Sequence, residues 1–456
     1  MENNANSNNN NNVEQIEYIK TLNAKIIPRK EHNMRRSDLS KHALDVLDRL
    51  ADNGYQAYAV GGCVRDRLMG YHPKDFDVVT NATPEQVKNV FRNCRLIGRR
   101  FRLAHIHFGR EIIEVATYRG HHKEQPPDGD AKNQNALSAD SGQILRDNVF
   151  GTIEEDAARR DFTFNAMYFN AKTEEILDFA DGLASIERKE IKMIGDLQTR
   201  FSEDPVRMLR AARFAVKLNM RIPDDMQKQI HQMGNSLANI PAARLFEETN
   251  KLFLSGYGAS ALDKLLELHL IFQLFPCLPS TLHDKSSKEY MVMRAMLENT
   301  DQRLINELRV TPAFLYATFL WYPLEELANK LQFESGMSQY DAMNIAGVET
   351  LSQQIKRIMI PKRFSSAIRD IWSLQYRLEK RTSKRPFVLL NHAKFRAGYD
   401  FLVLRGEVEG GKQQELAEWW HDFQHGDDSK RRKMLGPVKR RNRRPRSKSN
   451  KVKDAN

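Results

Sequence analysis

A glycine turn followed by two aspartates constrains this chain more than any other feature of its sequence. The pair Gly61-Gly62 ends a short apolar run that predicts a strand, and Asp75 and Asp77 accompany the next strand candidate, 76–79. Residues two apart on a strand point to the same face, roughly 7 Å from each other. Two carboxylates held that close repel one another and favour a divalent cation between them. The alternative is that Asp75 caps a turn and Asp77 faces solvent on an edge strand.

A third carboxylate stands in a later strand candidate. Glu114 is the single acid in the apolar, β-branched run 112–118. If this run lies beside the strand that carries Asp77, the sequence predicts a cluster of three carboxylates. Oxygen ligands suit Mg²⁺, which keeps some of its waters and takes substrate phosphates as further ligands. Two such ions serve an in-line displacement at phosphorus. The alternative is that Glu114 simply faces water.

The order of the predicted elements indicates an α+β region at the start of the chain. Ser40 caps a first helix that Gly54 ends, and Thr83 with Gln86 forms a capping box for a later one. Strands are expected at 55–60, 76–79, 95–97, 104–108 and 112–118. This order predicts a small mixed sheet with helices packed on it. From about residue 153 onward the apolar periodicity becomes almost entirely helical.

An arginine cluster follows the predicted sheet. Within the segment RRDFTFN, Arg160 carries a planar guanidinium of the kind that contacts a phosphate at two points, and Asp161 and Asn165 lie close to it in the chain. An ordinary ion-pair network with the preceding acids, such as Asp156, is the alternative for this segment.

A second cluster opens a helix further along. Asp204 and Arg207 are three residues apart, so they lie on neighbouring positions of one helix face and together offer an acceptor and donors to a base edge. Arg210 continues near that face. A Glu203–Arg207 pair that only stabilises the helix is the alternative.

The excess positive charge is confined to one end. The chain carries a net charge of +12, and residues 430–456 hold 13 Lys or Arg against one Asp, so the remainder is neutral. Such a tail is expected to be disordered and attracted to a polyanion, nucleic acid above all. A segment that docks on a partner protein is the alternative. The Asn-rich residues 1–12 are also expected to be disordered, because they bury too little apolar surface to offset their ordering entropy.

Cysteine usage and hydropathy bear on the compartment. The chain has no run of about 18 apolar residues, which argues against a membrane span. Its three cysteines, Cys63, Cys94 and Cys277, are widely separated, as suits reduced thiols, and they offer no zinc spacing. The sequence therefore predicts a cytoplasmic protein.

Four segments, in order, carry a resemblance to a known superfamily. They are GGCVRD at 61–66, DFDVVT at 75–80, RRDFTFNAM at 159–167 and EDPVRMLRAARFA at 203–215. They are similar to the motifs of the bacterial class II nucleotidyltransferases, which comprise poly(A) polymerases and CCA-adding tRNA nucleotidyltransferases. Segments such as FRNCRLIGRRFRLAHIHFG and KFRAGYDFLVLR resemble the poly(A) polymerases specifically. The likeness covers about residues 38–445; one departure is Cys63, where many relatives carry Gly or Ala.

The resemblance implies a reaction and a set of roles. The reaction is template-independent transfer of AMP from ATP to RNA 3′ hydroxyls with release of pyrophosphate, assisted by two Mg²⁺ ions, in mRNA processing and decay. The implied metal ligands are Asp75, Asp77 and Glu114, and the implied nucleotide contacts are Gly61, Gly62, Arg65, Asp66, Arg160, Asn165, Asp204, Arg207 and Arg210. Asp161 matches an acid of the active site, either a metal ligand or a residue that orients the ribose and arginines.

The resemblance also implies partners and a division of the chain. RNA 3′ ends and ATP are expected, with RNA-decay or RNA-chaperone proteins besides. The RNA-binding residues expected in the tail are Lys439, Arg440, Arg441, Arg443 and Arg444. The expected parts are a disordered segment 1–37, a nucleotidyltransferase head 38–184, an all-helical neck 185–262 with the nucleotide-recognition helix, a helical RNA-binding body 263–425 and a disordered basic tail 426–456.

Two other functions stay open at this stage. CCA addition to tRNA uses the same head and neck motifs, so the candidate catalytic residues do not separate it from poly(A) synthesis. A non-catalytic RNA-binding protein is the alternative from another class. The intact acids disfavour it, because a protein released from catalysis has no reason to keep carboxylates that repel each other.

Overall fold

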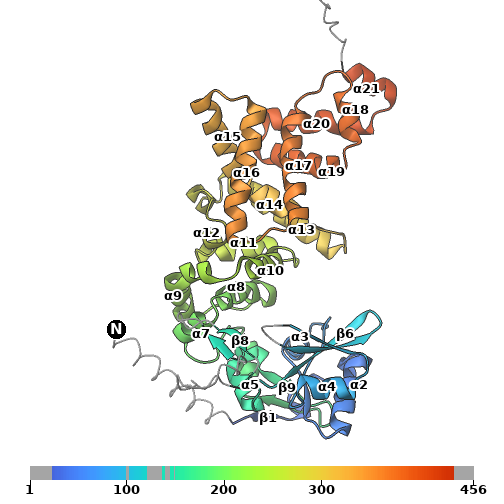
Figure 1. Cartoon of the computed structure of the whole chain (residues 1–456), viewed down its shortest axis with the longest axis vertical. Coiled ribbons are helices and arrows are strands. Elements are labelled where there is room, and N and C mark those ends of the chain that lie inside the picture. Colours follow the sequence, from blue (N-terminus) through green and yellow to red (C-terminus); the bar gives the residue numbers. More distant parts are fainter. Residues whose placement is uncertain (1–22, 99–101, 121–135, 139–143, 148, 436–456) are drawn as a thin grey trace, which may run out of the picture. The chain divides into compact units, whose positions relative to one another are not determined.

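The computed structural model describes residues 23–98, 102–120, 136–138, 144–147 and 149–435. Contacts within the chain divide it into two compact units, Met1–Pro276 and Cys277–Asn456 (Figure 1). The Asn-rich start and the five tail residues expected to bind RNA lie outside the described residues.

The first unit is built on a mixed sheet of eight strands in the order β1-β10-β9-β2-β3-β6-β5-β4. Its neighbours are antiparallel except for β3 and β6, which run parallel. The strands are β1 (Lys25–Ile27), β2 (Ala57–Val60), β3 (Asp77–Thr80), β4 (Cys94–Ile97), β5 (Leu103–Phe108), β6 (Glu111–Thr117), β9 (Met167–Phe169) and β10 (Ile176–Asp178). A separate pair consists of β7 (Ala136–Ser138) and β8 (Ile144–Asp147).

The sequence prediction located β2 to β6 within two residues and missed the other three strands of this sheet. Each missed strand has three residues, which is too short for an alternating pattern to be recognised. Strand β1 also corrects the expected disorder of residues 1–37. Its Ile26 is paired with Leu177 of β10, so the last part of that segment is ordered by the sheet edge.

Two helices begin where the capping residues predicted. The Ser40 hydroxyl accepts a hydrogen bond from the Ala43 amide at 3.1 Å and opens α2 (Lys41–Asp52). Thr83 and Gln86 form the reciprocal capping box of α4 (Pro84–Val90). Each bond satisfies an amide that the first helical turn leaves without a partner.

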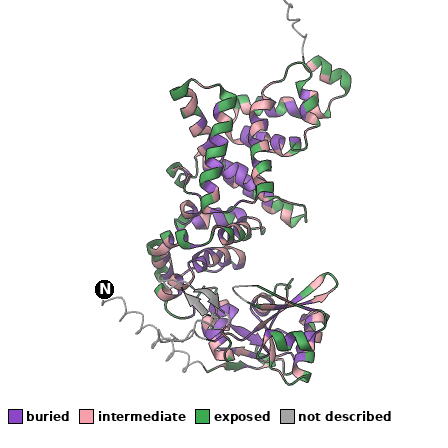
Figure 2. Ribbon diagram, viewed as in Figure 1, coloured by how far each residue is buried: buried purple, intermediate pink, exposed green. Residues whose placement is uncertain are grey.

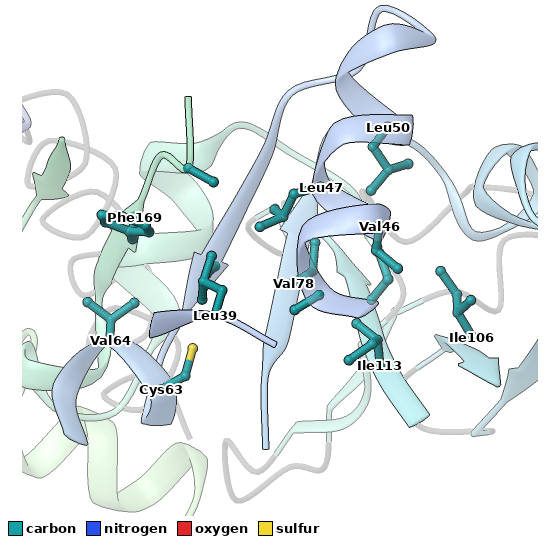
Figure 3. Packing of buried hydrophobic residues seen from close by; sticks show 14 of the residues in the cluster. Leu39, Val46, Leu47, Leu50, Cys63, Val64, Val78, Ile106, Ile113 and Phe169 are labelled. Atoms are coloured by element: carbon teal, nitrogen blue, oxygen red, sulfur yellow. The ribbon is translucent and has the colours of Figure 1, made fainter. Parts of the chain in front are cut away.

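The main core lies between these two helices and one face of the sheet. Leu47 and Leu50 of α2 pack toward Val78 of β3 and Ile113 of β6 (Figure 3). Side chains alternate between the two faces of a strand, so Asp77 and Glu114, the neighbours of Val78 and Ile113, lie on the opposite face. That second face is covered over its central strands by a smaller cluster that includes Ala157 of α5 (Ile153–Arg159).

Helices make up the rest of the first unit. They are η1 (Arg29–Glu31), η2 (Arg36–Asp38), α3 (Gly62–Leu68), η3 (Thr163–Asn165), α6 (Gly182–Glu187), α7 (Leu197–Glu203), α8 (Val206–Leu218), α9 (Asp224–Met233), η4 (Gly234–Asn239), α10 (Ala242–Phe253), α11 (Gly258–Glu267) and α12 (Ile271–Leu274). Helix α8 packs against both α10 and α11.

The second unit is helical throughout its described residues, as predicted for the body. Its helices are η5 (Ser280–His283), α13 (Lys288–Ile305), α14 (Pro312–Phe319), α15 (Trp321–Ser335), α16 (Gln339–Arg357), α17 (Lys362–Leu378), α18 (Arg385–Leu390), α19 (Phe395–Glu409), α20 (Gly411–His425) and α21 (Asp428–Met434). Trp420 is fully buried in a core shared by α17, α19 and α20. Over the described part of the chain, none of the helices is long and apolar enough to cross a membrane.

Candidate active site

The turn between β2 and α3 depends on glycine. Gly61 has φ = +73° and ψ = −122°, a conformation that side chains disfavour. A Cβ atom built on Gly61 would lie 3.7 Å from Nη1 of Arg160, and one on Gly62 would lie 3.7 Å from Nη2 of Arg65. Two guanidinium groups therefore flank a stretch of backbone that carries no side chains, and the expected contact of this turn with a nucleotide stays a prediction.

Arg65 is buried and fixed on several sides. Its Nη1 donates to Oδ1 of Asn165 at 2.7 Å, and its Nε donates to Oδ1 of Asp66 at 2.7 Å. The guanidinium also lies 5.0 Å from the ring centre of Phe214 on α8. Lys217 of the same helix is 3.5 Å from Asp66. Asp66 thus acts here as a support for Arg65, which in turn links the glycine turn to the helices that follow the sheet.

Asp77 and Glu114 face each other across the parallel pair of β3 and β6, in direct register. Strand β3 begins at Asp77, so Asp75 precedes the strand, and the expectation that both aspartates lie on one face of a strand is corrected for Asp75. The pKa of Asp77 is raised to about 6, first by the protein packed around it and then by Glu114 and Asp75, while Arg160 acts in the opposite direction. Asp77 keeps part of its surface open to solvent. Glu114 and Asp75 are therefore close enough to oppose the ionisation of Asp77.

Glu114 does not complete a ready-made metal site. Its Oε2 lies 3.2 Å from Nε2 of His105, its partner on the other neighbouring strand, β5. Among the residues that the structure describes, no three Asp, Glu, His or Cys side chains converge enough to hold a metal ion. The expected role of Glu114 as the third ligand stays a prediction. His105 is a neighbour that sequence reasoning missed, although its place in an alternating strand put it on the same face.

Asp161 is surrounded by donors. Arg210 of α8 donates to its Oδ2 at 2.6 Å, while Nδ2 of Asn165 and the amide of Phe162 donate to Oδ1 at 3.0 and 2.8 Å. Burial alone raises the pKa of this carboxyl, but Arg210 and the other donors outweigh it, so the pKa of Asp161 lies well below its ordinary value. The geometry favours the second of the two roles considered for Asp161, that of orienting the arginine.

Arg160 is anchored by the head itself. Its Nε donates to Oδ2 of Asp156 at 3.1 Å and to the Tyr168 hydroxyl at 2.9 Å, and that hydroxyl donates to the same oxygen of Asp156 at 2.8 Å. The ion pair considered as the plain alternative is therefore present. It leaves Nη1 of Arg160 directed at Gly61 and the Asn165 carbonyl, so the anchor and a phosphate contact are compatible.

Asp204 and Arg207 have separate partners. Asp204 precedes α8 rather than lying on it, and both its oxygens accept from Arg244 of α10, at 2.7 and 2.6 Å. Arg207 donates through Nη1 to Glu203 at 2.8 Å and to the Arg200 carbonyl at 2.7 Å. The predicted shared helix face is thus wrong for Asp204, because Pro205 is the N-cap and α8 begins only at Val206. Sequence reasoning also missed Arg244, because it lies 40 residues further along the chain and no local signal marks the contact.

Three family profiles match the chain in sequence order. They are described as "Poly A polymerase head domain" over residues 57–192, "Probable RNA and SrmB- binding site of polymerase A" over 219–281 and "Polymerase A arginine-rich C-terminus" over 335–453.

Relatives of known function are similar over almost the whole chain. Poly(A) polymerase I of Salmonella typhimurium is 47% identical over 433 residues, which cover 93% of this chain and 92% of that protein. Poly(A) polymerase I of Haemophilus influenzae is 45% identical over 427 residues, covering 93% of each. A CC-adding tRNA nucleotidyltransferase of Halalkalibacterium halodurans is 31% identical over 64% of this chain and 66% of that protein.

Solved structures share the fold at lower identity. The Bacillus stearothermophilus CCA-adding enzyme in complex with CTP superimposes with a TM-score of 0.55 at 23% identity, covering 84% of this chain and 81% of that one. The Thermotoga maritima CCA-adding enzyme complexed with tRNA has a TM-score of 0.55 at 20% identity, covering 84% and 83%.

Proposed function

The chain belongs to the poly(A) polymerase family of template-independent nucleotidyltransferases, and we propose that Asp75 and Asp77 form its reaction centre. The enzyme transfers AMP from ATP to RNA 3′ ends. In that reaction the 3′ hydroxyl oxygen bonds to the α-phosphorus of ATP, the bond from that phosphorus to the bridging oxygen breaks, and pyrophosphate leaves. The hydroxyl proton passes to solvent water as the new bond forms.

The observation that carries the proposal is the proximity of three carboxylates, Asp75, Asp77 and Glu114, at the start of β3. Burial first, and then Glu114 and Asp75 by their charge, raise the pKa of Asp77 to about 6. A protein that gains nothing from this repulsion has no reason to keep it, whereas a divalent cation relieves it at once.

These donors fit magnesium. Carboxylate oxygens are the ligands that Mg²⁺ prefers, with waters and substrate phosphates completing its shell, so the lack of a three-residue cluster within the described residues is compatible with the ion. We assign Asp75 and Asp77 as ligands of two Mg²⁺ ions, with Glu114 as the third candidate. The ions, when bound, stabilise the charge that develops on the attacking and leaving oxygens.

The glycine turn and its two arginines are the proposed triphosphate site. Gly61 and Gly62 leave their backbone open, and Arg65 and Arg160 flank it within 3.7 Å of the positions that their Cβ atoms would take. Guanidinium groups suit phosphate because each offers parallel donors. Asp66 and Asn165 hold Arg65 in place.

The proposed base and ribose contacts lie at the start of α8. Asp204 is the acceptor and Arg207 the donor for the adenine edge. The bonds of Arg207 to Glu203 and the Arg200 carbonyl are both made by Nη1, which leaves its other N–H groups for the base. Asp161 holds Arg210 toward the same region at 2.6 Å. We further propose that the enzyme acts in the cytoplasm on mRNA, and that Lys439, Arg440, Arg441, Arg443 and Arg444 hold the RNA by charge.

A metal-dependent primer extension assay tests the reaction centre. Replacing Asp75 and Asp77 together by Ala is expected to abolish incorporation of AMP into an RNA primer. Asp224→Ala is the matched control, since that carboxylate is 82% exposed and far from the turn in sequence. Extension by the double variant at the rate of the wild type would refute the assignment.

Incubation of primer with each nucleoside triphosphate separately tests the function itself. Poly(A) synthesis predicts long A tracts from ATP alone. The second candidate, CCA addition, is favoured by the 31% identity to the CC-adding relative and by the fold shared with CCA-adding enzymes. It predicts brief incorporation that requires CTP.

A further inference from the structure

A part of the sheet that the proposed reaction does not use lies beside the carboxylates. We define the open face as Arg95 and Ile97 of β4, Leu103, His105 and His107 of β5, and Ile112 of β6. Cross-strand partners share a face of the sheet. The pairs Arg95–His105, His105–Glu114 and Glu114–Asp77 therefore form one continuous row.

Two further pairs extend the open face on either side of that row. Ile97 is paired with Leu103, and His107 is paired with Ile112. The register between β3 and β6 begins at Asp77 and Glu114, and Ile112 lies two residues before Glu114 on the same face of β6. The open face therefore begins beside the Asp77–Glu114 pair and runs to the edge strand β4.

This face is exposed, in contrast to its reverse side. Ile97 is 40% and Ile112 is 45% exposed, whereas Ile106 and Ile113, whose side chains point to the other side, are 0% and 1% exposed. In Figure 2 the strands of the sheet carry both buried and exposed residues. Ile97 and Ile112 thus expose apolar surface on either side of the row that contains Arg95, His105 and Glu114.

The chemistry of the open face fits single-stranded RNA. Bases stack on imidazole rings and aliphatic side chains, and His105 and His107 have ring centres 6.4 Å apart. Arg95, exposed at the outer edge, supplies a donor for phosphate. The three strands span about 14 Å at the usual strand spacing of ~4.8 Å, a width that accommodates several stacked groups.

We propose that the open face binds the last nucleotides of the RNA and thereby delivers the 3′ hydroxyl to the carboxylates. The inference rests on the proposed function, because the occupant must end at Asp75 and Asp77. The nucleotides preceding the 3′ end cross β6, β5 and β4 with their bases on the histidines and isoleucines.

The first test separates binding of RNA from binding of ATP. Ile112→Glu places a negative charge against the RNA and is expected to raise the KM for an oligoadenylate primer roughly tenfold, equivalent to ~1.4 kcal/mol, without changing the KM for ATP. Ile112→Trp enlarges the stacking surface and is expected to keep or lower the primer KM. If Ile112 only stabilised the fold, both substitutions would raise the primer KM or impair folding.

Ile26→Glu is the matched control. Ile26 is 59% exposed on β1, the opposite edge of the same sheet, so an equal rise in primer KM there would overturn the proposal. If Ile112→Glu folds poorly, the primer KM of Ile112→Trp is the deciding measurement. The proposal would also be overturned if Ile112→Glu weakened the binding of another protein and left the primer KM unchanged.

A crosslinking experiment locates the RNA directly. A primer with 4-thiouridine next to its 3′ end is irradiated on the full-length enzyme, and the modified peptides are identified by mass spectrometry. Crosslinks in β4, β5 or β6 are expected, and crosslinks confined to the helical second unit would contradict the proposal. If the wild type adds no AMP to any primer, the proposed function fails; if it does and these two tests are negative, only this inference fails.

Discussion

Asp77, at the start of β3, and Asp161, which is bonded to Arg210 of α8, differ in how their charge is balanced. Asp77 is crowded by Glu114 and Asp75, and its pKa is raised to about 6. Asp161, in contrast, is held by Arg210 and has a lowered pKa. The proposed function assigns a cation from solution to the first group, whereas the charge of Asp161 is balanced within the protein. On that proposal, the difference distinguishes carboxylates that act on substrate from carboxylates that position other side chains.

The largest expected effect comes from removing charge at the crowded site. Asp77→Asn is expected to lower the rate of AMP transfer by about 10³-fold, or ~4 kcal/mol of lost stabilisation. The same change is expected to raise the melting temperature of the metal-free protein well above pH 6, because it removes a repulsion. Calorimetry and primer extension on one preparation check both, and a variant that is less stable than the wild type would break the comparison.

The pH dependence sharpens this prediction. The pKa of Asp77 in the folded protein lies above its ordinary value of 3.8, so ionising this carboxyl opposes folding. That cost is absent below pH 3.8, grows between pH 3.8 and about 6 and is complete above it. The stability difference between Asp77→Asn and the wild type is therefore expected to shrink as the pH falls from 8 to 4. A constant difference would exclude this origin.

The balanced site is expected to respond in the opposite direction. Asp161→Asn removes the acceptor charge from the Arg210 pair and is expected to destabilise the protein by about 2 kcal/mol, as well as to slow catalysis. Since the pKa of Asp161 is lowered, the pair stabilises the fold across the same range of pH 4 to 8. Denaturant melts at both ends of that range check this, with Asp224→Asn as the control; a gain in stability would contradict the account.

A smaller effect is expected at Asp204. Arg244→Gln loses the two-point contact that fixes this carboxylate, so the preference for ATP over CTP is expected to fall about tenfold with ~1 kcal/mol lost in stability. The ratio of kcat/KM for the two nucleotides measures it. Arg221→Gln is the control, because that arginine is 63% exposed in its pair with Glu190. An unchanged ratio would mean that Arg244 serves the fold alone.

Much of the fold could be predicted from local signals. The caps at Ser40 and Thr83 located their helices, and alternating apolar residues located β2 to β6. The register of Glu114 opposite Asp77 also followed the expectation that their strands are neighbours. Strands β1, β9 and β10 were not predictable, since three residues carry too little periodicity and their pairing is decided by contacts distant in sequence.

The residues of the candidate site could likewise be predicted only in part. The residue types and their order pointed to Asp75, Asp77 and the glycine turn. The partners that hold the other charges could not be predicted, because each lies far along the chain: Asp161 with Arg210, and Asp204 with Arg244. Arg65 with Asn165 is a third example, separated by 100 positions. Sequence periodicity shows which face a side chain occupies, but which opposite charge reaches it depends on how the helices pack.

The central claim is that the carboxylates at the start of β3, Asp75 and Asp77 with Glu114 beside them, bind a divalent cation. One measurement tests this claim most directly. The melting temperature of the nucleotide-free enzyme is recorded well above pH 6 with and without MgCl₂, for the wild type, Asp77→Asn and Asp161→Asn. Stabilisation by Mg²⁺ is predicted for the wild type and for Asp161→Asn, and none for Asp77→Asn. Equal stabilisation of Asp77→Asn and the wild type would contradict the account.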